Sequence, residues 1–214
     1  MNTVAIGAHP DDIEIGAGAS LAQHQAQGDK IRFLILTRGG KLSQPSKREK
    51  EALRAGEVLG VDDIRFLGYE DTKVPYDHDI IEELESQLND FGADRVYIHS
   101  ENDTHQDHRH AALSSVAATR NIDEVLAFES PSTRPSFTPQ YYNTLSEASL
   151  AQKIESIRSH KTQQEKLYLE AEAMNGLARF RGQQANARYA EAFQVIRIKQ
   201  SPHRTQALTP DSPE

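Results

Sequence analysis

Short apolar segments rich in β-branched residues alternate with longer segments of helical spacing through most of this 214-residue chain. The segments expected to form strands are Thr3–Ala8, Ile31–Thr37, Ile64–Leu67, Arg95–His99 and Glu124–Phe128. The helices expected between and after them are Gly16–Gln27, Ser46–Leu59, His78–Phe91 and His108–Arg120. Such alternation builds right-handed crossovers and a mostly parallel sheet with helices on both faces. The sequence therefore predicts a Rossmann-like three-layer α/β fold with its ligand site at the carboxyl ends of the strands.

The pattern changes after Phe128. Three prolines fall in residues 130–139, followed by two expected helices, Ser149–His160 and Gln163–Phe180, and a late strand, Ala192–Ile198. We expect this part to flank or cap the site. The last stretch, 201–214, holds three prolines and few apolar residues, which is typical of a disordered tail. A hydrophobic content of 37% suits a single domain, which we expect to span residues 1–200.

Charge and composition exclude several classes of function. The formal net charge of −8 argues against binding to nucleic acid or to an anionic membrane surface. No apolar stretch approaches the roughly 20 residues that span a bilayer, so membrane insertion is not expected. The chain starts without the basic and apolar segments of a secretory signal, which predicts a cytoplasmic protein. Because the sequence has no cysteine, any metal site must be built from His, Asp and Glu.

A first polar cluster, His9-Pro10-Asp11-Asp12, directly follows the first expected strand. His9 and Asp12 lie three residues apart, so on one turn they can converge on a divalent ion. Asp11 then remains free to take a proton from water. The alternative is structural, with Asp11 or Asp12 capping the following helix and complementing its dipole.

A second cluster, residues 99–110, follows the fourth expected strand and holds four histidines and three acidic residues. In a parallel sheet it reaches the same edge as the first cluster, although it could also be a solvated polar loop. His105 or His108 would add a second imidazole. Two imidazoles and a carboxylate suit a catalytic Zn²⁺, with Fe²⁺, Co²⁺ or Mn²⁺ as alternatives. A protonated His105, oriented or charged by Asp107, would stabilise the oxyanion of amide hydrolysis.

The segments Ala8–Asp12 and His105–His108 resemble the paired signatures of the LmbE/PIG-L family of zinc-dependent N-deacetylases. Further segments stand in the order in which that family has them, namely Thr37–Gly39, Arg48 with Glu51, Leu59–Val61, Phe66–Tyr69 with Asp71, His160–Gln163 and Tyr189–Phe193. The resemblance implies a Rossmann-like fold without a dinucleotide. It also implies that His9, Asp12 and His108 bind the metal and that Asp11 is the general base.

The same resemblance implies the kind of substrate. Members of the family act on N-acetylglucosamine joined to inositol, malate or another group, so we expect a small amino-sugar conjugate. Arg48, Asp71 and His105 would touch its hydroxyls or the oxyanion. Relatives assemble into trimers or hexamers, which makes a homo-oligomer an expectation for this chain. Two alternatives stay open, a hydrolase of a non-sugar amide and a non-catalytic protein of the same fold that binds a metal or a sugar.

Overall fold

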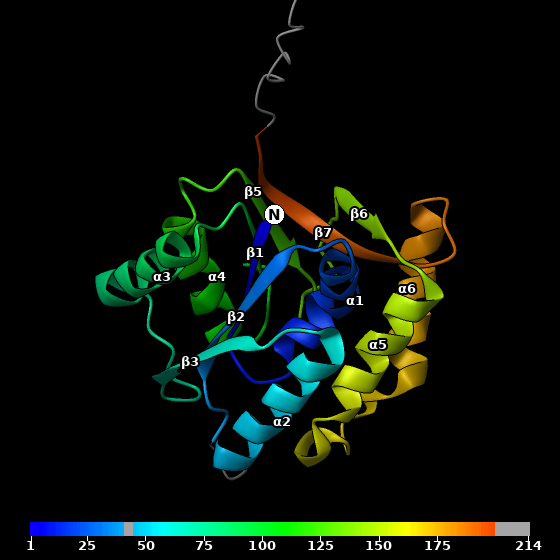
Figure 1. The fold of residues 1–214 in the computed structure, drawn as a ribbon, viewed down its shortest axis with the longest axis horizontal. Helices are drawn as coiled ribbons and strands as arrows, with labels where there is room; N and C mark the ends of the chain where they lie inside the picture. Colours follow the sequence, from blue (N-terminus) through cyan, green and yellow to red (C-terminus); the bar gives the residue numbers. More distant parts are fainter. Residues whose placement is uncertain (41–44, 200–214) are drawn as a thin grey trace, which may run out of the picture.

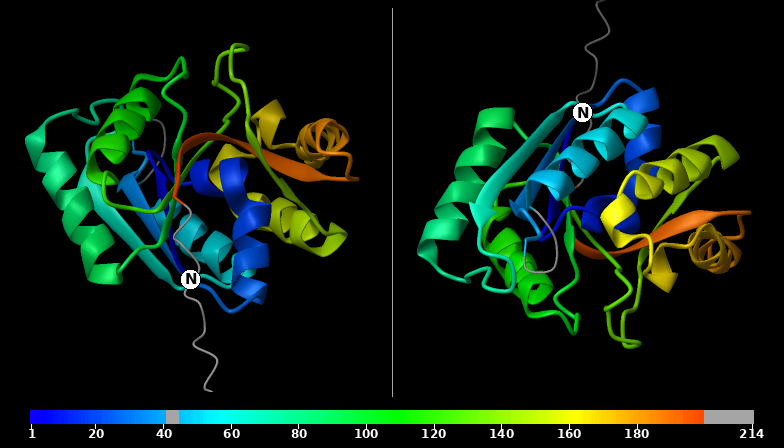
Figure 2. Two further views of the ribbon diagram at one scale, coloured as in Figure 1. Left: turned by 90° about the horizontal axis from the view of Figure 1, so that it is seen from above. Right: turned by 90° about the horizontal axis from the view of Figure 1, so that it is seen from below.

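The computed structural model describes residues 1–40 and 45–199, and within them the chain forms a seven-stranded sheet between two layers of helices (Figures 1 and 2). The strands are β1 (Asn2–Gly7), β2 (Lys30–Thr37), β3 (Asp63–Tyr69), β4 (Arg95–His99), β5 (Glu124–Phe128), β6 (Tyr141–Thr144) and β7 (Ala190–Ile198). The helices are α1 (Asp12–Ala26), α2 (Pro45–Leu59), α3 (His78–Phe91), α4 (Gln106–Ala118), α5 (Glu147–Arg158) and α6 (Ala171–Gln184).

The strand order is β3-β2-β1-β4-β5-β7-β6, in which β1 to β5 are parallel and β7 runs antiparallel to both of its neighbours. The predicted Rossmann-like three-layer fold is thereby confirmed. The predicted parallel strands are found with boundaries shifted by a few residues at most. The short strand β6 was not predicted, because four residues with no apolar alternation give no periodic signal.

The two faces of the sheet are covered by different helices. Val4 and Ile6 of β1 belong to the apolar cluster under α3 and α4, whereas Ala5 between them belongs to the cluster under α1 and α2. This alternation is the period of two that a strand imposes on its side chains. Helix α5 packs outside α1 and α2, and α6 packs against β7 (Figure 1). Both faces of β1 are therefore covered by helices.

The expected helix Gln163–Phe180 is wrong over its first half. Short 3₁₀ segments at Lys161–Gln163 and Leu167–Leu169 precede α6, which begins only at Ala171. Tertiary contacts explain the difference, because the N–H and hydroxyl of Thr162 donate to Glu51 on α2 at 3.1 and 2.6 Å. These bonds hold the segment against α2 in an irregular conformation despite its helical spacing.

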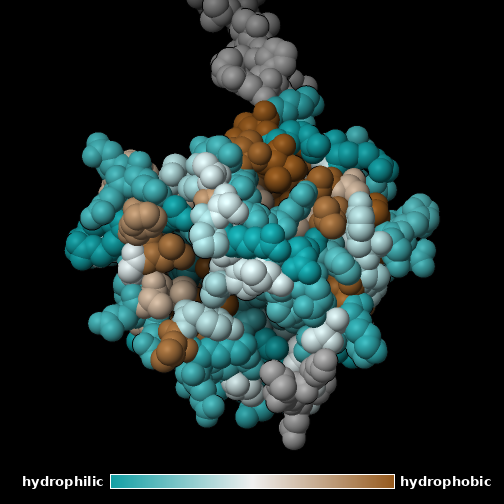
Figure 3. Space-filling model, turned by 180° about the vertical axis from the view of Figure 1, so that it is seen from behind, coloured by the Kyte–Doolittle hydropathy of each residue, from teal (hydrophilic) through white to brown (hydrophobic). Residues whose placement is uncertain are grey.

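The expected disordered tail, 201–214, lies outside the described residues. No helix within the described ranges has the length and apolar character needed to cross a membrane. On the face shown in Figure 3, hydrophilic residues predominate and hydrophobic ones are gathered in separate smaller areas.

Gly16 of α1 packs closely against the sheet. A Cβ added there would lie 2.2 Å from the ring of the fully buried Phe128 at the end of β5. We expect Gly16→Ala to lower the free energy of unfolding by about 1–3 kcal/mol through overpacking. The matched control is Gly176→Ala in α6, where an added Cβ meets nothing within 4 Å. That change should be neutral or stabilising by up to about 1 kcal/mol, and equal losses in urea denaturation of both variants would contradict the packing argument.

Candidate active site

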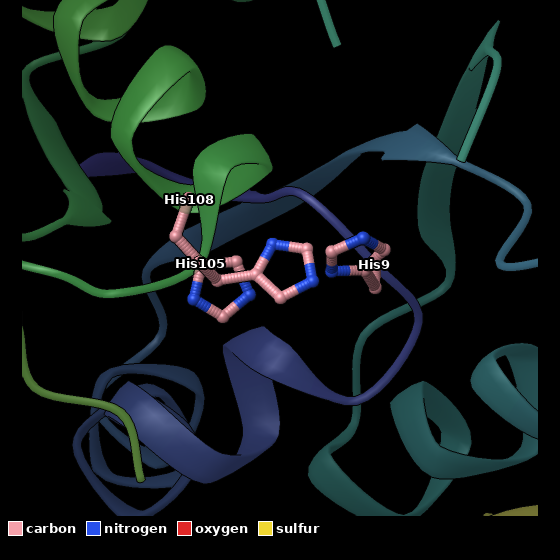
Figure 4. Close-up of side chains that lie close together, drawn as sticks. All are labelled: His9, His105 and His108. Carbon is pink, nitrogen blue, oxygen red and sulfur yellow. The ribbon is translucent and has the colours of Figure 1, made fainter. Parts of the chain in front are cut away.

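The two polar clusters meet at the carboxyl ends of the neighbouring strands β1 and β4. His9 follows β1, and His105 and His108 stand at the start of α4, so their rings come together from distant parts of the chain (Figure 4). They border a cleft of about 400 Å³. Its lining consists of His9, Asp11, Asp12, Ile15, Arg48, Asp71, Thr72, His105, His108, Pro131, Ser132, Gln163, Lys166 and Tyr168. Of the predicted site residues, Asp107 alone does not line it, being fully buried against His9.

The turn between β1 and α1 has an unusual backbone. Asp11 has a φ of 114°, a region that costs a non-glycine residue about 1–3 kcal/mol. It stands at the N-cap position, yet its side chain makes no capping hydrogen bond. The carboxylate of Asp12 accepts the N–H of His9 at 2.7 Å and closes the turn. The capping alternative therefore does not describe Asp11, whose carboxylate is directed elsewhere.

Arg48 of α2 holds this turn from the other side. Its Nη2 donates to the carbonyl oxygen of Pro10 and to Oδ1 of Asp11, the latter at 3.1 Å. The guanidinium is buried and also borders the cleft. The sequence predicted Arg48 as a substrate contact, and the structure adds a second task, because the same side chain fixes the carboxylate predicted to be the general base.

The predicted metal ligands are grouped around Asp12. Its Oδ2 lies 3.3 Å from Nδ1 of His9 and its Oδ1 lies 3.4 Å from Nε2 of His108. Donor atoms within 4.8 Å of one another occur in three groups among the described residues, His9 with His105 and His108, Asp12 with His99 and His108, and His9 with Asp71 and Asp107. The predicted set joins the first two of these groups through His108. Two imidazoles and one carboxylate make a donor set that suits zinc or a similar divalent ion.

Two further carboxylates contact the outer nitrogens of His9 and His108, the histidines predicted to bind the metal. Oδ2 of Asp103 lies 3.2 Å from Nδ1 of His108, and Oδ2 of Asp107 lies 3.1 Å from Nε2 of His9. Such outer carboxylates fix the tautomer and ring orientation of metal-binding histidines. The remaining nitrogens of both rings then face Asp12, so the residues present fit a bound divalent ion.

Asp107 therefore has a different partner from the one predicted. Its carboxylate accepts the N–H groups of Thr72 at 2.7 Å and Val74 at 3.2 Å in addition to contacting His9. Its contact with His105 is made by the backbone, since the N–H of Asp107 donates to Nδ1 of His105 at 3.2 Å. The side chain of Asp107 thus contacts His9, while it acts on His105 through this backbone hydrogen bond and through its charge, which acts to raise the pKa of that ring.

The same backbone hydrogen bond sets the protonation of His105. Because Nδ1 accepts, the ring proton of the neutral imidazole resides on Nε2. Burial lowers the pKa of His105 below its usual value, and the positive charges of His108 and His9 lower it further. The lowered pKa favours a neutral ring with an N–H available for donation, in contrast to the protonated ring expected from the sequence.

The pKa values of the adjacent carboxylates Asp11 and Asp12 are shifted in opposite directions. Burial raises the pKa of Asp11, and the charge of Asp12 adds to the rise against the opposing effect of Arg48. Burial also acts to raise the pKa of Asp12, but His108 and His99 hold it well below its usual value. Two neighbouring carboxylates with opposed shifts indicate two roles, an ionised ligand and a proton acceptor.

Sequence reasoning missed several residues of the site. His99 lies with Nε2 3.2 Å from Asp12 and stacks on His108 at a centroid distance of 4.1 Å. It belongs to the second polar cluster, which is the signal that could have found it. Gln163, Lys166 and Tyr168 form a wall of the cleft from the segment before α6. All three fall in the segment that was expected to flank or cap the site, and Gln163 also belongs to the segment His160–Gln163 that resembles the family.

Comparisons with known proteins identify the family and the fold. The family model described as "PIG-L: GlcNAc-PI de-N-acetylase" matches residues 4–119. The uncharacterized deacetylase YaiS of Escherichia coli (strain K12) is 36% identical over 166 residues, covering 74% of this chain and 90% of that protein. The diacetylchitobiose deacetylase of Thermococcus kodakarensis is 24% identical over 220 residues, covering 90% of this chain and 82% of that protein. The crystal structure of the conserved protein TT1542 from Thermus thermophilus superposes with a TM-score of 0.82 at 26% identity, covering 97% of this chain and all of the other.

Asp103, whose carboxylate contacts His108, allows a test of the predicted metal site that needs no substrate. We expect Asp103→Asn to weaken zinc affinity by about 10-fold to 100-fold, because the ring of His108 loses its charged partner. The control is Glu101→Gln, an exposed carboxylate two residues away in the same loop. Affinities are measured by competition with a chelating dye. Equal zinc affinity in both variants and the wild type would contradict the assignment of Asp103.

Proposed function

The chain belongs to the PIG-L family of GlcNAc-PI de-N-acetylases, and on that basis we propose that it removes an N-acetyl group from an amino-sugar-containing substrate such as an N-acetylglucosaminide. The observation that carries the proposal is the placement of Asp11. This buried carboxylate, with its raised pKa and no capping role, borders the same cleft as the metal-binding side chains. A protein that only binds a metal or a sugar has no need of such a group.

In the proposed site His9, Asp12 and His108 hold the divalent ion, with zinc as the first choice and Fe²⁺, Co²⁺ or Mn²⁺ as alternatives. When bound, such an ion polarises the amide carbonyl and lowers the pKa of water. The outer carboxylates of Asp103 and Asp107 keep the ligand rings in place.

Asp11 is proposed as the general base and then the general acid. Its carboxylate accepts a proton from the attacking water while the new C–O bond forms at the amide carbon. It returns that proton to the amide nitrogen as the C–N bond breaks, so that acetate and the free amine leave. A raised pKa suits both transfers, because it brings the carboxyl closer to the pH at which the enzyme works.

His105 is proposed to stabilise the oxyanion that develops on the carbonyl oxygen. As a neutral ring with its proton on Nε2, it donates a hydrogen bond that is strongest when that oxygen is negative. Fixation of the ring by the start of α4 lowers the reorganisation needed during the reaction.

The amino-sugar part of the proposal is supported by the name of the diacetylchitobiose deacetylase to which the chain is similar. Asp71 and Arg48, which border the cleft, are proposed to contact sugar hydroxyls. The carboxylate of Asp71 lies 3.3 Å from Nε2 of His9, so a hydroxyl bound there would stand beside the metal-binding residues.

Amine release from zinc-loaded protein tests the reaction and the base together. Substrates are a panel of N-acetylglucosaminides, diacetylchitobiose and simple non-sugar acetamides. We expect release from the amino sugars, and we expect Asp11→Ala to lower kcat by about 10²-fold to 10⁴-fold while metal analysis still finds bound zinc. His108→Ala should instead be metal-poor. Full activity in Asp11→Ala would discard the proposed base, and a zinc-loaded wild type that releases no amine from any of these compounds would overturn the reaction.

The pH profile tests the pairing of Arg48 with Asp11. Burial raises the pKa of Asp11 and the guanidinium of Arg48 lowers it, so Arg48→Met should raise it further. Less of the carboxylate is then ionised at mildly acidic pH, and the acidic limb of kcat/KM moves to higher pH. Arg54→Met, an exposed position on the same helix, serves as the control and should leave the limb in place. A limb that stays unmoved, or moves to lower pH, in Arg48→Met would contradict the pairing.

A further inference from the structure

Lys153 of α5 and Glu191 of β7 form an ion pair deep inside the molecule, outside the catalytic cleft. Nζ of Lys153 lies 2.6 Å from Oε1 of Glu191, and the two side chains are 6% and 5% exposed. Taking both charges out of water carries a desolvation cost that their attraction offsets only with good geometry and further hydrogen bonds. Stability alone is therefore a weak explanation for the pair.

The further hydrogen bonds of this pair all go to the backbone of α1. Glu191 accepts the N–H of Ala19 at 3.1 Å and that of Ser20 at 2.7 Å, and Nζ of Lys153 donates to the carbonyl oxygen of Ile15 at 2.6 Å. In a regular helix those two N–H groups bond to the carbonyls four residues earlier, Ile15 and Gly16. The ion pair thus engages α1 at the junction between its first and second turns.

Gly18 gives the lysine access to this junction. A Cβ at position 18 would lie 3.2 Å from Cγ of Lys153, closer than an ordinary van der Waals contact. The absence of a side chain there lets the stem of Lys153 run along the helix to the carbonyl of Ile15.

Ile15 connects the ion pair to the catalytic turn. Its N–H donates to the carbonyl oxygen of Asp11 at 3.0 Å, and its own carbonyl oxygen receives the ammonium of Lys153. Asp11 has a positive φ, and such a conformation persists only where the surroundings fix it from more than one side. Arg48 holds the turn from α2, and the chain of contacts through Ile15 holds it from α5 and β7.

From this geometry we propose that Lys153 and Glu191 are positioning residues, which lock the Asp11–Ile15 turn so that the base and the metal ligand Asp12 keep their relative placement. The proposal rests on the proposed function for its effect on catalysis. Apolar side chains of similar volume could fill the same space, but they can neither donate to the Ile15 carbonyl nor accept the N–H groups of Ala19 and Ser20. The charges are thus needed for the geometry of the turn.

Three variants separate positioning from stability. Lys153→Met removes the donor, and the double variant Lys153→Met/Glu191→Leu replaces the whole pair by apolar groups, which often restores or raises stability. The control is Arg95→Met, which breaks a partly buried ion pair with Glu124 whose side chains are 12% and 18% exposed. Arg95 begins β4, so this pair lies at the end of the strand away from the cleft. For each protein we would measure the melting temperature, kcat and KM with an N-acetylglucosaminide, and the dissociation constant for zinc, all well below the melting transition.

We expect kcat to fall about 10-fold to 100-fold in Lys153→Met and in the double variant, with KM changed less than about threefold, because small displacements of a catalytic group cost rate rather than affinity. Zinc affinity should fall by about 10-fold in both, as for loss of an outer support of a ligand. Arg95→Met should lose melting temperature alone. A folded double variant with wild-type kcat and zinc affinity would overturn the proposal, and so would equal losses in Arg95→Met.

The measurement of zinc affinity separates this test from the test of the proposed deacetylation. If the wild type releases no amine, the proposed function fails by itself, while a zinc affinity that drops in Lys153→Met but not in Arg95→Met still supports the positioning role. Unchanged zinc affinity in all variants of such an inactive protein would overturn it.

Discussion

The rest of the site depends on the sharp turn that places two adjacent carboxylates, Asp11 and Asp12, at the end of β1. A regular helix start would direct consecutive side chains about 100° apart around the axis. The positive φ of Asp11 instead lets Asp12 bond back to the N–H of His9 while Asp11 is left beside Arg48. This one strained residue thus places two neighbouring, chemically identical carboxylates in different surroundings, as the proposed division between metal binding and proton transfer requires.

The buried ionisable groups of the site offset their desolvation cost through hydrogen bonds and ion pairs with one another. The outer nitrogens of His9 and His108 contact carboxylates that are themselves held by backbone N–H groups or hydroxyls, as Asp103 is by Ser130 at 2.7 Å. Burial acts to raise the pKa of Asp103, but these partners bring it below its usual value. The other nitrogen of each ring faces the carboxylate of Asp12, whose negative charge favours a positive charge beside it. The electrostatics of the cluster therefore suit a cation at the place where the donor atoms converge.

The sequence was most informative where chemistry follows directly after a strand. His9–Asp12 and His105–His108 were predicted to meet because parallel strands end at one edge of a sheet, and the fold confirms that they do. It could not tell which carboxylate would pair with which ring, because Asp103 and Asp107 are equally close to His105 in the sequence and their partners are decided by the path of the chain through residues 72–74 and 130–133. The segment before α6 was misassigned for a related reason, since the hydrogen bonds of Thr162 to Glu51, more than a hundred residues away, hold the start of this segment against α2.

Two parts of the chain line the cleft, residues 9–132 and the segment before α6. The residues proposed for metal binding and proton transfer all lie within residues 4–119, the part that the family model matches. Gln163, Lys166 and Tyr168 approach from beyond it, on a segment of two short 3₁₀ turns that the hydrogen bonds of Thr162 hold against α2. Irregular segments tolerate substitution better than the sheet edge, where a shifted side chain would disturb the metal-binding donors. Under the proposed function, substitutions along residues 161–169 would therefore alter the choice of substrate with less effect on the reaction. The contacts of Lys153 and Glu191 with α1 connect α5 and β7 to the turn at Asp11, and so connect the C-terminal third of the chain to the half that holds the proposed catalytic residues.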